Sequence, residues 1–245
     1  MNKKIALVTG ANKGIGYETA KQLAQAGVKV LAASRNKEKG EAAVASLKKE
    51  GLDVEFLQLD VLNENDIDNA YNFIQEQFGK LDILVNNAGI QIESTEWASN
   101  TAVQVNEAAL RETLDTNFFS IVKLTDKLLP LIKKSGSGRI VNLSSILGSL
   151  ALHADENSPI YSSKLFAYNA SKTILNAYTI HLAAAVKNDG IKVNAAHPGW
   201  VKTDMGTDAA PMNVAEGAKT SVSLALLDEK GPTGKYIHLE QVLPW

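Results

Sequence analysis

Short apolar runs alternate with longer stretches of helical periodicity along most of the chain. The runs are rich in Val, Ile, Leu and Ala without polar alternation, as in strands that are buried on both faces. They span residues 5–10, 28–34, 54–60, 81–89, 138–145, 191–199 and 234–239. Apolar positions with the spacing of an amphipathic helix fill residues 14–27, 36–50, 64–78, 106–134, 159–188 and 213–226. This alternation predicts an α/β fold, in which helices cover both faces of a doubly wound parallel sheet of about seven strands.

Three longer irregular stretches interrupt the alternation, at residues 90–105, 146–158 and 200–212. Each follows a predicted strand, so we expect each at the carboxyl edge of the sheet, where open α/β sheets bind ligands. The chain has no linker-like stretch, internal repeat or low-complexity tract, and its length of 245 residues suits one domain over residues 1–245.

Composition and charge argue against several classes of partner and of chemistry, but they do not identify the function. The net charge is −2, so no strong field favours a nucleic acid or a membrane surface as partner. Cys is absent, which excludes disulfides, thiolate metal ligands and thiol nucleophiles. The start, MNKKIALVTG, runs into a strand-like segment without a signal-peptide or membrane-spanning run, so we expect a cytoplasmic protein. The histidines lack the spacing of metal ligands, and no metal site is expected.

A glycine-rich turn follows the first predicted strand, in the segment TGANKGIG, residues 9–16. Gly10, Gly14 and Gly16 stand where this strand turns into a helix. Without a Cβ, the backbone there can approach a pyrophosphate and let the helix N-terminus face it. The position between a strand and an amphipathic helix favours a dinucleotide site over a tight turn that binds nothing.

Two Tyr–Lys pairs stand close together in SPIYSSKLFAYNASK, namely Tyr161 with Lys164 and Tyr168 with Lys172. The opening Ser-Pro is typical of an N-cap and first helical residue, which would place all four side chains in one stripe of a helix. Helix geometry alone admits both pairs. A Lys four residues after a Tyr leans back over it, as Lys172 would over Tyr168, whereas Lys164 is only three residues after Tyr161. Tyr168 would also lie on a rigid interior turn and Tyr161 in the first turn, where helix ends fray, so both details favour Tyr168.

The spacing TGxxxGxG resembles that of the short-chain dehydrogenase/reductase family, and further motifs follow in the family's order. They are Asp60 after the third strand, NNAG at 86–89, TLDTNFF around Asn117, GRIVNLSS ending in Ser144 and Ser145, YNASK at 168–172, and PGWVKTDM at 198–205. The resemblance covers residues 3–205 without a break and implies a Rossmann-type fold. The family motif YxxxK matches YNASK and not YSSKL, which also favours Tyr168 over Tyr161.

The resemblance implies a catalytic set of Asn117, Ser145, Tyr168 and Lys172. Tyr168 would protonate the oxygen of a carbonyl that gains a hydride, while Lys172 would lower the pKa of the phenol and hold the nicotinamide ribose. Ser145 would donate a hydrogen bond to the substrate oxygen, and Asn117 would hold a water that passes protons to Lys172. Ser145 is chosen over Ser144 because the family's Ser has the second position, and a strand turns only one of two successive side chains to the site. Asn117 alone could equally be a buried amide that bonds helix carbonyls.

The same resemblance implies the residues around a cofactor. They are Gly10, Asn12, Lys13, Gly14, Ile15, Gly16, Arg35, Asp60, Val61, Asn87, Ala88, Gly89, Tyr168, Lys172, Pro198, Gly199, Val201 and Thr203. The second strand ends in Ser34 and Arg35, without the acidic residue that holds the adenosine ribose in NAD-preferring relatives, so we expect NADPH. Arg35 can make paired hydrogen bonds to a 2′-phosphate, which Lys13 could also reach. Asp60 would meet the adenine ring, although such an Asp can also serve only to cap a turn.

An insertion at 146–158, together with TGANKGIG, PGWVKTDM and the tail LPW, resembles the carbonyl-reductase branch of the family. The branch implies a small-molecule substrate, a ketone, aldehyde or quinone, in a pocket formed by Ser145, Tyr168 and Trp200; Trp97 could line it too, or cover core. The alternatives are an alcohol or hydroxysteroid dehydrogenase working oxidatively, and a non-catalytic cofactor-sensing regulator, which the intact catalytic set disfavours. The insertion could block the helices through which many family members associate, so a monomer is favoured over a homo-oligomer.

Overall fold

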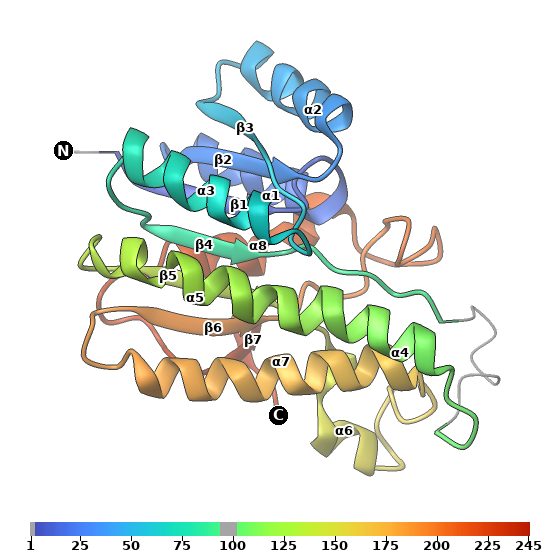
Figure 1. Cartoon of the computed structure of the whole chain (residues 1–245). Coiled ribbons are helices and arrows are strands. Elements are labelled where there is room, and N and C mark those ends of the chain that lie inside the picture. The colour runs from blue at the N-terminus through green and yellow to red at the C-terminus, as the bar shows by residue number, and fades with distance from the viewer. Residues whose placement is uncertain (1–2, 94–101) are drawn as a thin grey trace.

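Within the described residues, 3–93 and 102–245, the computed structural model of the protein has one sheet of eight strands (Figure 1). The strand order is β3-β2-β1-β4-β5-β6-β7-β8, parallel throughout except for the antiparallel pair β7 and β8. The strands are β1 (Ile5–Thr9), β2 (Lys29–Ser34), β3 (Val54–Gln58), β4 (Ile83–Asn86), β5 (Arg139–Leu143), β6 (Lys192–Ala196), β7 (Tyr236–His238) and β8 (Gln241–Val242). The predicted Rossmann-type sheet is confirmed, and β8 is an addition that the apolar pattern does not predict. The organisation as one domain stays a prediction.

Helices lie on both faces of this sheet (Figure 1). They are α1 (Gly14–Gln25), α2 (Lys37–Lys49), α3 (Glu64–Gln77), α4 (Glu107–Leu114), α5 (Ser120–Lys133), α6 (Leu150–Ala154), α7 (Phe166–Ala185) and α8 (Val214–Ala225). Four of these helices begin at an asparagine whose side-chain oxygen accepts a first-turn N–H: Asn36, Asn63, Asn106 and Asn213. Such caps satisfy N–H groups that have no acceptor within the helix.

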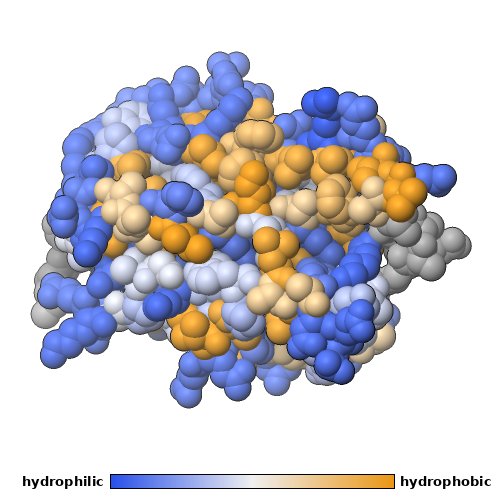
Figure 2. Space-filling view, turned by 90° about the horizontal axis from the view of Figure 1, so that it is seen from below, coloured by the Kyte–Doolittle hydropathy of each residue, from blue (hydrophilic) through white to orange (hydrophobic). Residues whose placement is uncertain are grey.

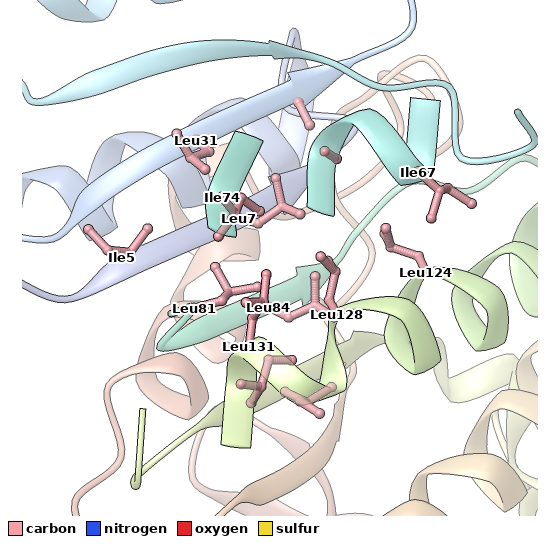
Figure 3. Close-up of a cluster of buried hydrophobic side chains, with 14 of the residues drawn as sticks. Ile5, Leu7, Leu31, Ile67, Ile74, Leu81, Leu84, Leu124, Leu128 and Leu131 are labelled. Carbon is pink, nitrogen blue, oxygen red and sulfur yellow. The ribbon is translucent and has the colours of Figure 1, made fainter. Parts of the chain in front are cut away.

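The strands are apolar on both faces because each face lies against a layer of helices. In β1, Ile5 and Leu7 point into one cluster, which α3, α5 and α7 complete, and Figure 3 shows part of it. Ala6 and Val8 point into the other cluster, which α1, α2 and α8 complete. This two-sided burial explains why the strands appear in the sequence as continuous apolar runs.

The predicted helix over residues 106–134 consists of three helical segments in succession. α4 leads into the π-helical segment η2 (Asp115–Phe119), which leads into α5. The wider π turn accommodates an extra residue, and such turns occur frequently at functional sites. It contains Asn117, whose side chain is fully buried.

The prediction that a helix begins at residue 159 is wrong. α7 begins at Phe166, and residues 156–162 form turns. The hydroxyl of Ser158 accepts the N–H of Ile160 at 3.4 Å, but the residues that follow form turns and not a helix. Tyr161 therefore lies before α7, and Tyr168 lies in its first turn rather than on an interior one.

The stretch 146–158, expected to be irregular, contains the 3-10 segment η3 (Ile146–Gly148) and α6. The N–H of Ala151 and the hydroxyl of Ser149 donate to the carbonyl oxygen of Trp245, at 3.0 and 3.2 Å. The Trp245 ring in turn stacks on the buried ring of Tyr236 in β7. These contacts hold the inserted segment against the edge of the sheet. In the part of the chain that the structure describes, no helix has the length and apolarity needed to cross a membrane.

Candidate active site

The glycine turn between β1 and α1 is packed too closely at Gly16 to admit a side chain. A Cβ at Gly16 would lie 2.4 Å from Asn87 Nδ2 and 2.5 Å from the carbonyl oxygen of Gly10. The N–H of Ala11 donates to the carbonyl oxygen of Ala33 at 2.9 Å, which joins the turn to the end of β2. The turn is therefore a fixed surface of backbone at the carboxyl edge of the sheet.

The segment Asn87-Ala88-Gly89 ties the end of β4 to the end of β1. Asn87 Nδ2 donates to the carbonyl oxygen of Thr9 at 2.7 Å, and the N–H groups of Asn87 and Ala88 both donate to Thr9 Oγ1 at 3.0 Å. These three hydrogen bonds join the loop after β4 to the end of β1. A contact with a cofactor stays a prediction.

Lys172 is 4% exposed and lies one helical turn after Tyr168 on α7. Its Nζ donates to the carbonyl oxygen of Leu143, at the end of β5, at 2.8 Å, and lies 5.6 Å from the centroid of the Tyr168 ring. Burial lowers the pKa of this ammonium to about 8, because a charged amine loses solvation in the interior. Lys172 can therefore titrate near the working range of an enzyme.

The phenol of Tyr168 faces Ser145, which follows β5. Burial raises the pKa of Tyr168 to about 12, although a hydrogen bond with Ser145 lowers it in part. The phenol therefore holds its proton at neutral pH. Ser144 points elsewhere, since its hydroxyl donates to Asn176 Oδ1 at 2.6 Å, so of the two serines it is Ser145 that meets Tyr168.

Asn117 is brought to the same place by the π turn. Its Nδ2 donates to the carbonyl oxygen of Ile90 at 2.8 Å and to Ser171 Oγ at 3.0 Å, and its Oδ1 accepts the N–H of Ile90 at 2.8 Å. A Cβ at Gly89 would lie 3.2 Å from Asn117 Oδ1 and 3.6 Å from Lys172 Nζ, so both side chains pack against this glycine. Both amide N–H groups are occupied, so of the side-chain atoms only Oδ1 could hold a water.

The loop after β6 lies over the glycine turn. Lys13, at the start of α1, forms an ion pair with Asp204, and the position of a Cβ at Gly14 is 3.6 Å from Thr203 Cγ2. Val201 is buried and forms a bridge with Met212, which closes the loop at its base.

Trp200, in the same loop, is 55% exposed, and its Nε1 donates to the carbonyl oxygen of Gly206 at 2.6 Å. Pro198 and Gly199 are half-buried at the exit from β6.

The remaining predicted cofactor residues follow β2 and β3 or lie within the glycine turn. Arg35 is exposed at the end of β2, whereas Ser34 is buried and its hydroxyl donates to the carbonyl oxygen of Asn36 at 3.0 Å. Asp60 accepts the N–H of Leu62 at 3.0 Å, so one of its carboxylate oxygens serves a turn. The other positions are half-buried, at Asn12, Ile15 and Val61. Trp97, named for the substrate pocket, lies outside the described residues.

Sequence reasoning missed two side chains that hold this site together. Glu93 accepts the N–H groups of Ala167 and Tyr168 at 2.9 and 2.8 Å. His197 Nδ1 accepts the N–H groups of Ile146 and Gly199 at 3.1 and 3.4 Å, and burial lowers its pKa to about 3, so the ring is neutral. The sequence carries no signal for either residue, because both act on segments that are distant along the chain.

The model of the short chain dehydrogenase family matches residues 4–213. Carbonyl reductase (NADPH) 1 of Mus musculus is 35% identical over 288 residues, which cover 100% of this chain and 99% of the relative. (+)-Neomenthol dehydrogenase of Capsicum annuum is 32% identical over 305 residues, which cover 98% and 96%. The expected resemblance to the carbonyl-reductase branch is thus confirmed.

Solved structures agree with the fold. Carbonyl reductase Sniffer of D. melanogaster superposes with a TM-score of 0.86 at 29% identity, and the match covers 100% of both chains. An NADPH-bound carbonyl reductase from chicken fatty liver superposes with a TM-score of 0.85 at 26% identity, covering 100% of this chain and 95% of that one.

Proposed function

Because the chain belongs to the short chain dehydrogenase family, we propose that it reduces the carbonyl group of a ketone, aldehyde or quinone with NADPH, and that Tyr168 donates the proton. The observation that carries the proposal is the meeting of Tyr168 with Ser145 and Lys172 at the carboxyl edge of the sheet. The names of relatives, among them carbonyl reductase (NADPH) 1, support both the reaction and the cofactor.

The residues at the glycine turn fit a phosphorylated dinucleotide. The N-cap residue of α1 is Lys13, which makes no side-chain cap, and the first turn has no acidic residue, so the helix N-terminus can receive an anion. Arg35 is exposed at the end of β2, where it could bind a 2′-phosphate. Lys13 is exposed within the glycine turn, and its ammonium could bind the same phosphate. When bound, the reduced nicotinamide supplies the hydride.

The protein's own residues manage the oxygen of the carbonyl. Tyr168 keeps its proton at neutral pH because of its raised pKa, which suits a donor in the reducing direction. Ser145 can donate a hydrogen bond to the same oxygen as negative charge develops on it. Lys172, charged below a pKa of about 8, stabilises the phenolate that remains after the proton leaves. Asn117 Oδ1 would accept from a water that returns a proton to Lys172.

We place the substrate under the loop after β6, with Trp200 as one wall of its pocket. The indole ring is 55% exposed while its Nε1 is held by Gly206, so it presents a fixed apolar face. This position would let the pocket select among carbonyl compounds by shape.

The experiment that tests the proposal follows the loss of NADPH absorbance with a panel of ketones, aldehydes and quinones. We expect turnover with NADPH that exceeds turnover with NADH, and a product alcohol or hydroquinone for each substrate consumed. The same panel of alcohols with NADP+ tests the oxidative direction. Tight NADPH binding without turnover of any substrate would instead indicate a cofactor-sensing protein.

We further propose that the chain acts as a monomer. α6 lies beside the outer face of α7, and a groove of about 650 Å³ separates them, lined among others by Leu150, His153 and Thr173. Seen from this side, apolar residues form a broken band among hydrophilic ones, rather than one continuous surface (Figure 2). Light scattering should give the mass of a single chain, and a stable tetramer would refute the idea that α6 blocks association.

A further inference from the structure

Helix α7, which carries Tyr168 and Lys172, begins without a cap of its own. Its N-cap residue is Leu165, whose side chain cannot accept a hydrogen bond, whereas α2, α3, α4 and α8 each begin at a capping asparagine. The first hydrogen bond along the helix runs from the N–H of Asn169 to the carbonyl oxygen of Leu165 at 2.8 Å. The N–H groups of the preceding residues must therefore find acceptors outside the helix.

The carboxylate of Glu93 supplies two of these acceptors. Its Oε1 accepts the N–H of Ala167 at 2.9 Å and its Oε2 accepts the N–H of Tyr168 at 2.8 Å, across 74 and 75 residues of sequence. An ionised carboxylate is well suited to this position, because the N-terminus of a helix carries partial positive charge and charge-assisted hydrogen bonds are the stronger ones. The start of α7 is thus set by a residue from the loop after β4.

Glu93 also closes a ring of hydrogen bonds around Tyr168. The carbonyl oxygen of Tyr168 accepts the hydroxyl of Ser171 at 2.7 Å, and Ser171 Oγ accepts Asn117 Nδ2 at 3.0 Å. Asn117 in turn exchanges two hydrogen bonds with Ile90, three residues before Glu93 along the chain. The N–H and the C=O of Tyr168 are therefore both tied to the loop that begins at Gly89.

From this ring we infer that Glu93 is a positioning residue for Tyr168. This inference rests on the proposed function, in which the Tyr168 phenol donates the proton. Gly89 packs against Lys172 and Asn117, so the segment 89–93 touches the candidate site at one end and holds the start of α7 at the other. Loss of the cap should let the first turn of α7 shift and move the phenol relative to Ser145. Proton transfer is sensitive to such a shift, while the glycine turn that binds the cofactor is on another element.

Two variants separate the cap from its charge. Glu93→Ala removes both acceptors. Glu93→Gln keeps one oxygen acceptor, but its amide N–H₂ group faces the second backbone N–H and it carries no charge. The matched control is Glu112→Ala, which removes an exposed carboxylate from the neighbouring helix α4.

The experiment measures kcat and KM for a ketone, NADPH binding by fluorescence, and thermal unfolding for each variant. We expect Glu93→Ala to lower kcat by about tenfold to a hundredfold, the size of effect that small misplacements of a reacting group produce. Glu93→Gln should lie between Glu93→Ala and the wild type, and NADPH affinity should stay unchanged. Formate should restore part of the kcat of Glu93→Ala, because it can occupy the vacated carboxylate position, whereas chloride at equal ionic strength should not.

Wild-type kcat in Glu93→Ala would overturn the inference. So would a variant whose lower unfolding temperature accounts for the whole loss, with normal kcat for each folded molecule and no response to formate. Tyr168→Phe is measured in parallel to test the proposed function separately. If that variant keeps full activity, the proposed function fails; if it is inactive and Glu93→Ala is not impaired, only the role of Glu93 fails.

Discussion

Residues 158–172 place two lysines over tyrosine rings, in settings that differ in almost every other respect. In the outer pair, Lys164 Nζ lies 4.3 Å from the centroid of the Tyr161 ring, and in the inner pair, Lys172 Nζ lies 5.6 Å from that of Tyr168. The outer pair lies on a turn: Tyr161 is 37% exposed, and Lys164 donates to the carbonyl oxygen of His153 at 3.0 Å. The inner pair lies where β5, α7 and the loop after β4 meet.

The outer pair has the shorter distance from Nζ to the ring centroid, but its exposed setting is less suited to catalysis. Proximity of an ammonium to a phenol is common on a helix or turn, and water screens it when both groups are exposed. Burial is what moves the pKa of Lys172 to about 8 and that of Tyr168 to about 12, and it also fixes both groups against Ser145 and Gly89. Perturbed pKa values and convergent partners are the reasons for which we propose the inner pair as the functional one.

The largest expected effect separates the two tyrosines. Tyr168→Phe should lower kcat by about a hundredfold to ten-thousandfold, the range that general acid catalysis contributes, because the carbonyl oxygen loses its proton donor. Tyr161→Phe should retain nearly all activity, since its hydroxyl donates to Glu156 Oε1, at 3.4 Å, and Glu156 is not part of the candidate site. Steady-state kinetics and NADPH binding are measured for both. The reverse result, with Tyr161→Phe inactive, would show that the outer pair carries the chemistry.

The next effect concerns the two lysines and pH. Burial holds the pKa of Lys172 at about 8, so its charge is present below that pH and is lost as the pH rises through it. We expect kcat/KM for the carbonyl substrate, at saturating NADPH, to be level near neutrality and to fall above about pH 8 for this reason. Lys172→Arg, whose guanidinium stays charged, should lose this decline even if its overall rate is lower.

Lys164→Met provides the control for this pH dependence. It removes the exposed ammonium of the outer pair and should leave both kcat and the pH profile as in the wild type. A profile that changes with Lys164 and not with Lys172 would contradict the comparison.

The sheet could be predicted from the sequence because its signal is repeated within each strand. Ile5 and Leu7 on one side of β1, and Ala6 and Val8 on the other, are all apolar, which requires helices on both faces. The family resemblance then identified Tyr168, Lys172, Ser145 and Asn117, which the structure brings together. β8 was missed because two residues cannot show a periodicity.

The start of α7 could not be predicted, because its cause lies elsewhere in the chain. Ser158 and the following proline have the chemistry of a helix start, but Glu93 supplies acceptors to Ala167 and Tyr168 instead. The π turn at Asn117 was missed for a similar reason. Its apolar pattern differs little from that of an α-helix, and it is fixed by the bonds of Asn117 with Ile90 and Ser171.

A smaller effect tests whether the cofactor at the inner pair is NADPH rather than NADH. Arg35→Ala should weaken NADPH binding by about tenfold to a hundredfold, because hydrogen bonds to charged groups contribute about 1.5–3 kcal/mol. NADH lacks the 2′-phosphate, so its binding should barely change. Lys37→Ala, which removes another exposed positive charge two residues further on, is the matched control. The measurement is kcat/KM with each cofactor. Equal losses for both cofactors in Arg35→Ala would refute the proposed 2′-phosphate site, and so would a wild type that prefers NADH.

The smallest effect concerns Lys13, which forms an ion pair with Asp204 across the glycine turn. Lys13 holds the pKa of Asp204 below its usual value, so this carboxylate is ionised at neutral pH and would compete with the proposed 2′-phosphate for the same ammonium. Asp204→Asn should therefore tighten NADPH binding by about twofold to fivefold, the scale of exposed ion pairs, and leave NADH unchanged. Titration at low and high salt is the check, because screening should reduce the gain. If Asp204→Asn instead weakens the binding of both NADPH and NADH, the ion pair serves to hold the loop after β6 over the site. Lys13 would then bind the loop and not the 2′-phosphate.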